Sequence, residues 1–387
     1  MSNLAMIPGV LFALSIYGAV NVYIGRRLYG GLARIFPSLG GRVFAWAYGM
    51  VAAAFVFSYL PLPRALDHWA TLFGSYWMGI WFYLILWFVL ADIGIAVGRL
   101  VRLIRSPVSP AVRFRIWLLV LALTIGFTGY GAWNATQISE ARYEVKLANR
   151  SLDKPLKLVL ISDLHLGAAR SEGRLEEIVA RINRMEPDLV VMAGDLFNDD
   201  FDAIRNPERA AGLLRQLEAA YGVYASLGNH DGGRTLPQML QFLEDSGVTV
   251  LIEEHVVIDG RFVLIGRLDP SPIGGYGDLV RGETDGLLAA LSGTDPALPR
   301  IVLDHTPVRL SQYRNEVDLI LSGHTHRGQI FPGNLVTRML YEVDYGLYQK
   351  DPASPHVIVT SGVGTWGMPM RVGSDCEIVE IVLKQGS

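Results

Sequence analysis

The chain of 387 residues has a single cysteine, Cys376, so an intrachain disulfide is excluded and a zinc site made of several thiolates is not available. Acidic residues are nearly missing from the first third of the chain. Up to Gln137 the sequence has ten Lys and Arg but two Asp and Glu, which leaves 24 basic and 35 acidic residues after it. The acidic remainder lacks a basic stripe, which argues against nucleic acid as a partner. The two parts of the chain are therefore suited to different surroundings.

The first third contains four long hydrophobic runs. They cover residues 7–24, 44–60, 72–97 and 116–133, and Asp92 is the one charged residue within them. A helix needs about 17–25 apolar residues to cross a bilayer. Four such runs leave too little amphipathic helix to cover them in a soluble fold. The sequence therefore predicts a transmembrane region of four helices over residues 1–135, in which Asp92 is a structural carboxylate that snorkels or forms an ion pair near Arg99.

Arginine is distributed unevenly among the loops between these runs. The first loop has Arg26, Arg27, Arg34 and Arg42, the second has only Arg64, and the third has Arg99, Arg102, Arg105, Arg113 and Arg115. By the positive-inside rule, the first and third loops face the cytoplasm. We therefore expect a multi-pass protein of the cell (inner) membrane whose second domain lies on the extracytoplasmic side.

Five apolar runs with strand character in the second part end in polar side chains. They lie at residues 159–167, 189–195, 224–231, 301–305 and 319–326. The carboxyl ends of strands are where ligands gather in layered α/β folds, so these side chains are expected to meet. Carboxylate, amide and imidazole without thiolate favour hard or borderline divalent metals. Two such metals, with Asp195 able to bridge them, form a clamp that activates water at a phosphoryl group.

Asp-x-His, Gly-Asp, Gly-Asn-His-Asp, a lone His and Gly-His-x-His, in this order over about residues 156–383, resemble the calcineurin-like metallophosphoesterases. The closest likeness is to bacterial membrane-associated members with N-terminal transmembrane helices. The resemblance implies a four-layer αββα sandwich over residues 156–387, after a linker over 136–155. It also implies two divalent metal ions, manganese, iron or zinc, with manganese favoured.

The same resemblance implies roles for individual residues. Asp163, His165 and His326 would hold one metal, Asn229, His305 and His324 the other, and Asp195 would bridge them. His230 would protonate the leaving oxygen or stabilise the transition state, a role that suits an imidazole because its pKa lies near neutrality. Asp231 would orient His230.

Two further features suggest substrate contacts. Arg327 stands where the closest relatives carry Gly, and is either a phosphate ligand or a solvated loop residue. The uncharged loop at residues 362–370 contains Trp366 and two Met, and Arg371 follows it. This loop either packs in the core, or grips an acyl chain with Trp366 at headgroup level and Arg371 on a lipid phosphate.

These observations favour a membrane-anchored, dinuclear metal-dependent phosphoesterase. We expect it to cleave a phosphoester or pyrophosphate bond of a lipid or lipid-linked substrate, so its partners would be membrane lipids and a phosphorylated lipid or small molecule. The alternatives are a tethered hydrolase of soluble phosphodiesters and a catalytically inactive membrane sensor or binding protein. A transporter with an accessory enzyme is disfavoured, because paired broken helices are missing from the sequence pattern.

A reporter that is active only outside the cytoplasm tests the topology. Fused after Ser387 it is expected to be active, and fused after Arg105 it is expected to be silent, because arginine-rich loops stay in the cytoplasm. Reporter activity in cells expressing each fusion gives the answer, and the reverse pattern would overturn the charge argument.

Overall fold

The structure is a computed structural model that describes residues 3–57, 64–105, 107–147, 150–169 and 171–386. The chain divides into two compact units, Met1–Tyr130 and Gly131–Ser387. Each unit has its own hydrophobic core, so each is described by itself.

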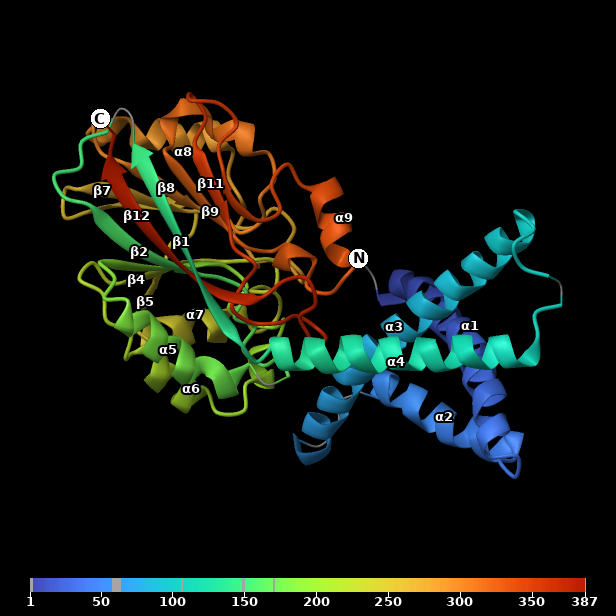
Figure 1. Ribbon diagram of the computed structural model, residues 1–387. Helices are drawn as coiled ribbons and strands as arrows, with labels where there is room; N and C mark the ends of the chain where they lie inside the picture. The colour runs from blue at the N-terminus through green and yellow to red at the C-terminus, as the bar shows by residue number, and fades with distance from the viewer. Residues whose placement is uncertain (1–2, 58–63, 106, 148–149, 170, 387) are drawn as a thin grey trace. The chain divides into compact units, whose positions relative to one another are not determined.

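The first unit consists of apolar helices (Figure 1). They are α1 (Asn3–Ile35), α2 (Gly41–Phe57), α3 (Arg64–Leu100) and α4 (Pro110–Asn134). Three of them, α1, α3 and α4, are long and apolar enough to cross a membrane, whereas α2 has 17 residues. Of the four predicted spans, three correspond to helices that satisfy this criterion, and the second corresponds to the shorter apolar helix α2. The last residues of the predicted second run, 58–60, lie outside the described part.

Asp92 of α3 is held by α1. Its carboxylate accepts a hydrogen bond of 2.7 Å from the Tyr23 hydroxyl and forms an ion pair with Arg27. The expectation of a paired, structural carboxylate is met, but the partner is Arg27 and not Arg99. The sequence distance to Arg99 is shorter, yet packing of α1 against α3 decides which guanidinium comes within reach.

The second unit contains two six-stranded sheets. The first sheet has the order β1-β12-β2-β3-β4-β5, and the second has the order β10-β11-β9-β8-β7-β6. The strands are β1 (Ile138–Leu147), β2 (Leu156–Ile161), β3 (Leu189–Ala193), β4 (Val223–Ser226), β5 (Val248–Val250), β6 (Glu254–Ile258), β7 (Phe262–Gly266), β8 (Arg300–Leu303), β9 (Leu319–Ser322), β10 (Gly346–Tyr348), β11 (His356–Val359) and β12 (Cys376–Gln385). The helices are η1 (Glu172–Arg174), α5 (Leu175–Arg184), η2 (Phe201–Ala203), α6 (Pro207–Leu214), α7 (Leu236–Asp245), α8 (Thr284–Ala290), η3 (Leu291–Gly293), η4 (Leu310–Glu316), η5 (His326–Gly328) and α9 (Gly333–Leu340).

The two sheets pack face to face, and helices cover their outer faces (Figure 1). In β2 the side chains of Leu158 and Leu160 lie in the core between the sheets, and those of Val159 and Ile161 pack under helices α5 to α7. Burial on both faces explains why this strand reads as a continuous apolar run instead of an alternating one. A third cluster packs α8 against the second sheet. The four-layer αββα architecture is thereby confirmed.

The predicted linker over residues 136–155 requires a correction. Ten of its residues form β1, which pairs in parallel with β12 along its whole length. Val145 and Leu147 are buried between the sheets, whereas Glu140, Arg142 and Glu144 remain accessible on the other side. An edge strand with one solvated face is polar enough to resemble a tether in the sequence. The tether is therefore largely a strand of the second unit.

The last turn of α4 also belongs to the second unit. The carbonyl of Gly131 accepts a hydrogen bond of 2.9 Å from the backbone N–H of Arg371, and the Asn134 side chain donates to the carbonyl of Ser374 at 3.0 Å. Few residues separate this turn from β1.

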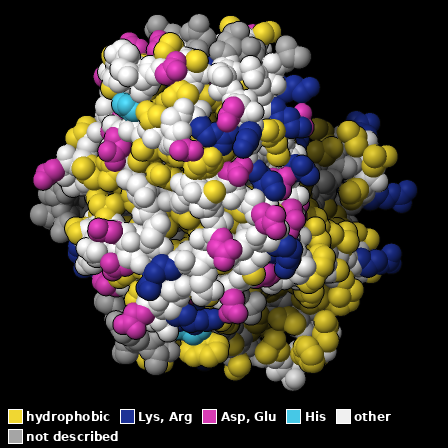
Figure 2. All heavy atoms as spheres, turned by 90° about the vertical axis from the view of Figure 1, so that its left-hand side faces the viewer, with side chains coloured by type: hydrophobic (Ala, Val, Ile, Leu, Met, Phe, Trp, Pro, Cys, Tyr) yellow, Lys and Arg dark blue, Asp and Glu magenta, His cyan; other side chains and the backbone are white. Residues whose placement is uncertain are grey.

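On the face shown in Figure 2, acidic and basic side chains are interspersed, in keeping with the acidic excess of this part of the sequence.

Candidate metal centre

Five strands deliver polar side chains to one region of the second unit. β2, β3 and β4 are parallel neighbours in the first sheet, and β8 and β9 are parallel neighbours in the second. Carboxyl ends of parallel neighbours lie at the same edge of a sheet, so the residues that follow these strands come together. The two edges also meet, because Nδ1 of His305 after β8 lies 2.7 Å from the carbonyl oxygen of Ala193 in β3.

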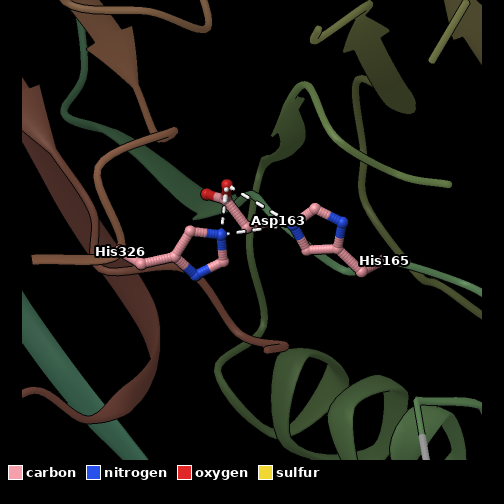
Figure 3. Close-up of side chains that lie close together, drawn as sticks. All are labelled: Asp163, His165 and His326. Carbon is pink, nitrogen blue, oxygen red and sulfur yellow. Dashed lines mark hydrogen bonds and ion pairs between the residues drawn. The ribbon is translucent and has the colours of Figure 1, made fainter. Parts of the chain in front are cut away.

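Asp163, His165 and His326 form a first buried group (Figure 3). The Nε2 atoms of the two histidines are 3.2 Å apart, and Nε2 of His326 lies 3.2 Å from Oδ1 of Asp163. Two ring nitrogens and a carboxylate oxygen thus point at one another in a water-poor place. Such convergence of donor atoms suits a shared cation.

Asp195, His305 and His324 form a second group. Nε2 of His305 lies 3.1 Å from Oδ2 of Asp195, and Oδ1 of Asn229 lies 2.8 Å from Nδ1 of His324. The carbonyl of Ala193 can only accept a hydrogen bond, so Nδ1 of His305 carries the proton and Nε2 faces Asp195. Nε2 of His305 is buried without a hydrogen-bond partner in the described part of the chain, as expected of a ligand atom.

Asp195 lies between the two groups. Its Oδ2 atom is 3.8 Å from Nε2 of His165 and 3.1 Å from Nε2 of His305, so one carboxylate reaches both sets of ligands. Its Oδ1 atom accepts a hydrogen bond of 2.8 Å from the backbone N–H of His230. This is the position that a bridging ligand requires. The structure therefore brings together all seven residues that the resemblance assigned to the metals.

The protonation states of Asp163 and His165 suit metal binding. Burial raises the pKa of Asp163, but the neighbouring imidazoles, foremost His326, outweigh it and hold that pKa well below its usual range. Burial lowers the pKa of His165 to about 3. At neutral pH the carboxyl group is therefore ionised and the imidazole neutral, which are the forms that bind a cation. The residues present fit a pair of divalent ions.

The backbone at the ligands is unusual. Asp163, His165, Asp195, His324 and His326 all have positive φ, between 47° and 69°. Residues other than glycine adopt this conformation at a cost of about 1–3 kcal/mol each, and such strain gathers at functional sites. The strain turns each side chain away from the direction of its strand and into the centre.

The glycines that precede the ligands allow close approach. A Cβ atom on Gly228 would lie 2.3 Å from Oδ1 of Asp195, and one on Gly323 would lie 1.8 Å from the Ser162 hydroxyl oxygen. No side chain fits at either position. Close packing of ligand-bearing turns thus explains the Gly-Asn-His and Gly-His elements of the sequence pattern.

His230 is oriented by Asp199, which the sequence did not single out. Nδ1 of His230 lies 2.7 Å from Oδ1 of Asp199. Asp231, the expected partner, instead accepts hydrogen bonds of 2.8 Å from the backbone N–H groups of Gly228 and Phe197. Asp231 therefore braces two loops, and its assignment as the orienting residue is corrected. Asp199 lies in the loop after the Gly-Asp pair, where no sequence pattern distinguishes it.

Burial and nearby charges shift the pKa values of His230 and Asp231. Burial lowers the pKa of His230, but its hydrogen bond to Asp199 and the nearby carboxylates raise it more, so the net pKa lies above its ordinary value. Burial, followed by the charge of Asp195, raises the pKa of Asp231 to about 7. A protonated His230 is the form that donates a proton.

Trp366 lies beside His230 at the surface. The ring centroids are 5.9 Å apart, and Trp366 is 47% exposed. Gln329 anchors this loop, since it accepts from the backbone N–H of Trp366 at 2.9 Å and donates to its carbonyl at 2.7 Å. The guanidinium of Arg327 lies 4.2 Å from the centroid of the Tyr345 ring.

Arg371 does not reach the surface. Its side chain is fully buried and donates hydrogen bonds to the carbonyl oxygens of His326 (3.0 Å), Gly364 (2.6 Å) and Gly362 (3.3 Å). The guanidinium nitrogen that donates to Gly362 and Gly364 also lies 3.1 Å from Nδ1 of His326. The predicted contact with a lipid phosphate is therefore wrong, because packing encloses this guanidinium. Arg371 instead holds the ring of His326 from behind.

Replacement of Arg371 tests this positioning role. Arg371→Met removes the donors behind His326, and affinity for one of the two metals is expected to fall about 10–100-fold, the usual effect of losing a partner of a ligand. Metal content after dialysis at fixed free manganese measures it, with thermal unfolding as a check on folding. The metal affinity of the Arg371→Lys protein should fall less, and the Trp366→Ala protein should keep both metals. Two metals retained by the Arg371→Met protein would contradict the role.

The chain is similar in sequence to known metallophosphoesterases. A family model described as calcineurin-like phosphoesterase matches residues 156–328. A "transmembrane protein with metallophosphoesterase domain" from Danio rerio is 32% identical over 400 residues, covering 97% of this chain and 89% of that protein. An "uncharacterized metallophosphoesterase" of Helicobacter pylori is 30% identical over 270 residues, covering 68% and 70%. Among solved structures, a dimetal phosphatase from Danio rerio has a TM-score of 0.35 and 17% identity, covering 54% of this chain and 88% of that one.

Proposed function

The chain belongs to the calcineurin-like phosphoesterases and is a metal-dependent phosphoester hydrolase with apolar N-terminal helices; from this premise we propose that it cleaves a phosphoester or pyrophosphate bond of a lipid or lipid-linked substrate at the membrane surface. The observation that carries the hydrolase assignment is the position of Asp195 between two buried ligand groups. Manganese is the proposed metal.

Each part of the site has a task in such a reaction. Asp163, His165 and His326 would hold one cation, Asn229, His305 and His324 the other, and Asp195 would contact both. Two divalent cations there would supply an activated water and neutralise charge on the phosphoryl oxygens. His230, held by Asp199, is the residue proposed to donate a proton to the leaving oxygen.

Substitution of His230 separates catalysis from metal binding. His230→Ala is expected to lower turnover about a hundredfold or more, because a general acid is lost, while two metals per chain remain. Asp195→Ala should lose both activity and metal, because its carboxylate serves both groups. Hydrolysis of an aryl phosphodiester with manganese, measured beside metal content, distinguishes the two variants. Metal loss in the His230→Ala protein would make His230 a ligand and overturn its assignment.

An apolar surface next to the site supports a lipid substrate. Helix α9 has no buried residue, and Leu335, Val336, Met339 and Leu340 are between 49% and 86% exposed. The helix follows η5, which carries His326, and Gln329 links that region to the Trp366 loop. An exposed apolar face beside a polar reaction centre suits a substrate with a polar head and an acyl tail.

The same surface lies near the end of a membrane-type helix. Gly131 of α4 bonds to Arg371, and a Cβ atom on Gly373 would lie 3.7 Å from the side chain of Asn334 in α9. The first turn of α9 and the last turn of α4 thus contact the same short loop. With the arginine-rich loops in the cytoplasm, we place the metal centre at the extracytoplasmic leaflet of the cell (inner) membrane.

Substrate comparison tests the lipid proposal. A lipid phosphoester should give a higher kcat/KM than its water-soluble headgroup analogue, because apolar contacts contribute binding energy that only the lipid can use. Trp366→Ala and Met339→Ser should reduce kcat/KM for the lipid and leave the soluble analogue unaffected. Val280→Ser, at a residue that is 78% exposed elsewhere in the unit, is the matched control. Equal kcat/KM for both substrates in the unaltered protein would indicate a tethered hydrolase of soluble phosphodiesters.

A further inference from the structure

The first unit contains a cavity of about 290 Å³ between α1, α3 and α4. Four arginines line it: Arg26, Arg27, Arg34 and Arg113. Asp92 is the one acidic residue in the lining. The four arginine side chains are exposed, so their guanidinium groups are accessible to an anion at this cavity.

The arginines are not all satisfied by the protein. Arg27 pairs with Asp92, and Arg34 donates to the carbonyl of Pro110. Arg26 and Arg113 form no hydrogen bond or ion pair with any other residue in the described part of the chain. Two guanidinium groups therefore remain free to bind a ligand at this cavity.

Trp117 packs against α1 at the wall of the cavity. Its side chain is buried and lines the cavity, yet its indole N–H has no hydrogen-bond partner among the described residues. The ring is fixed by α1, because a Cβ atom on Gly31 would lie 2.1 Å from it. Guanidinium groups can only donate hydrogen bonds, so the complementary ligand carries several acceptor oxygens and negative charge. A phosphate group has this chemistry.

The rest of the lining is apolar. Phe88, Ala91, Ile95, Phe114 and Ile116 share the cavity with the arginines. The three helices around it are each long and apolar enough to cross a membrane. A ligand that joins a phosphate to hydrocarbon therefore matches the whole lining, whereas a free anion matches only part of it.

We propose that this cavity binds the phosphate headgroup of an anionic phospholipid, with Arg26 and Arg113 as donors and the apolar lining against the acyl chains. Basic cavities between transmembrane helices on the cytoplasmic side bind lipid headgroups in this manner. By the arginine distribution the cavity faces the cytoplasm. The site lies in the first unit and is independent of the metal centre, so it stands whether or not the hydrolase acts on lipid.

Native mass spectrometry of the full chain in detergent tests the proposal. Dioleoyl phosphatidylglycerol is expected to bind at one molecule per chain, more tightly than dioleoyl phosphatidylcholine. Arg113→Gln should weaken the affinity for phosphatidylglycerol about fivefold, the effect expected from about 1 kcal/mol per basic residue. The double variant Arg26→Gln, Arg113→Gln should weaken this affinity about 30-fold. Arg115→Gln, two residues along the same helix and outside the lining, should bind as the unaltered protein does.

A second pair of variants tests the cavity itself. A Cβ atom on Gly30, which lines the cavity, meets no atom within 4 Å, and the same holds for Gly18 on the same helix outside the lining. Gly30→Leu should fill the cavity and abolish tight phosphatidylglycerol binding, whereas Gly18→Leu should not. Equal binding of the two lipids, or equal effects of Arg113→Gln and Arg115→Gln, would overturn the site. Displacement of the lipid by millimolar inorganic phosphate would make the ligand a free anion and overturn the lipid assignment.

Discussion

The convergence of buried ionised carboxylates and imidazoles is the constraint on which the second unit depends. Asp163 and Asp195 are removed from water, and the carboxylate of each lies close to an imidazole, 3.2 Å from Nε2 of His326 and 3.1 Å from Nε2 of His305. Burial of such groups is unfavourable unless opposite charge accompanies them. Two parallel strand sets must therefore end at the same place, and the turns after them must adopt positive φ to aim the side chains inward. The fold holds these charged groups together, and without bound cations their burial would destabilise it.

The C-terminal segment connects that centre to the rest of the unit. β12 lies between β1 and β2, so the end of the chain closes the first sheet. The loop before β12 carries Trp366 at the surface and Arg371 in the interior, where it holds His326. The same loop bonds to Gly131 and Asn134 at the end of α4. A single loop thereby contacts a metal ligand, the exposed aromatic residue next to His230 and the last turn of a membrane-type helix.

The first unit combines apolar helices with a few placed charges. Asp92 is satisfied by Tyr23 and Arg27, which leaves Arg26 and Arg113 without a partner in the described residues. One carboxylate cannot neutralise four arginines. An external anion removes the imbalance. The two units therefore share one theme, since each gathers charges of one kind that a bound ion of the opposite kind completes.

The sequence by itself determined the apolar helices and the polar residues at the strand ends, because each of these is encoded by hydrophobicity and residue type within a few positions. The resemblance to a family supplied the assignment of the seven candidate metal ligands. Only the tertiary structure decided that residues 138–147 form a strand, since the burial of Val145 depends on β12, more than 200 residues away. It also decided that Asp199 and not Asp231 faces His230, and that Arg371 lies behind His326 and not at the surface. The direction of a side chain is set by long-range packing and by strained turns, and a local pattern of residues carries no record of either.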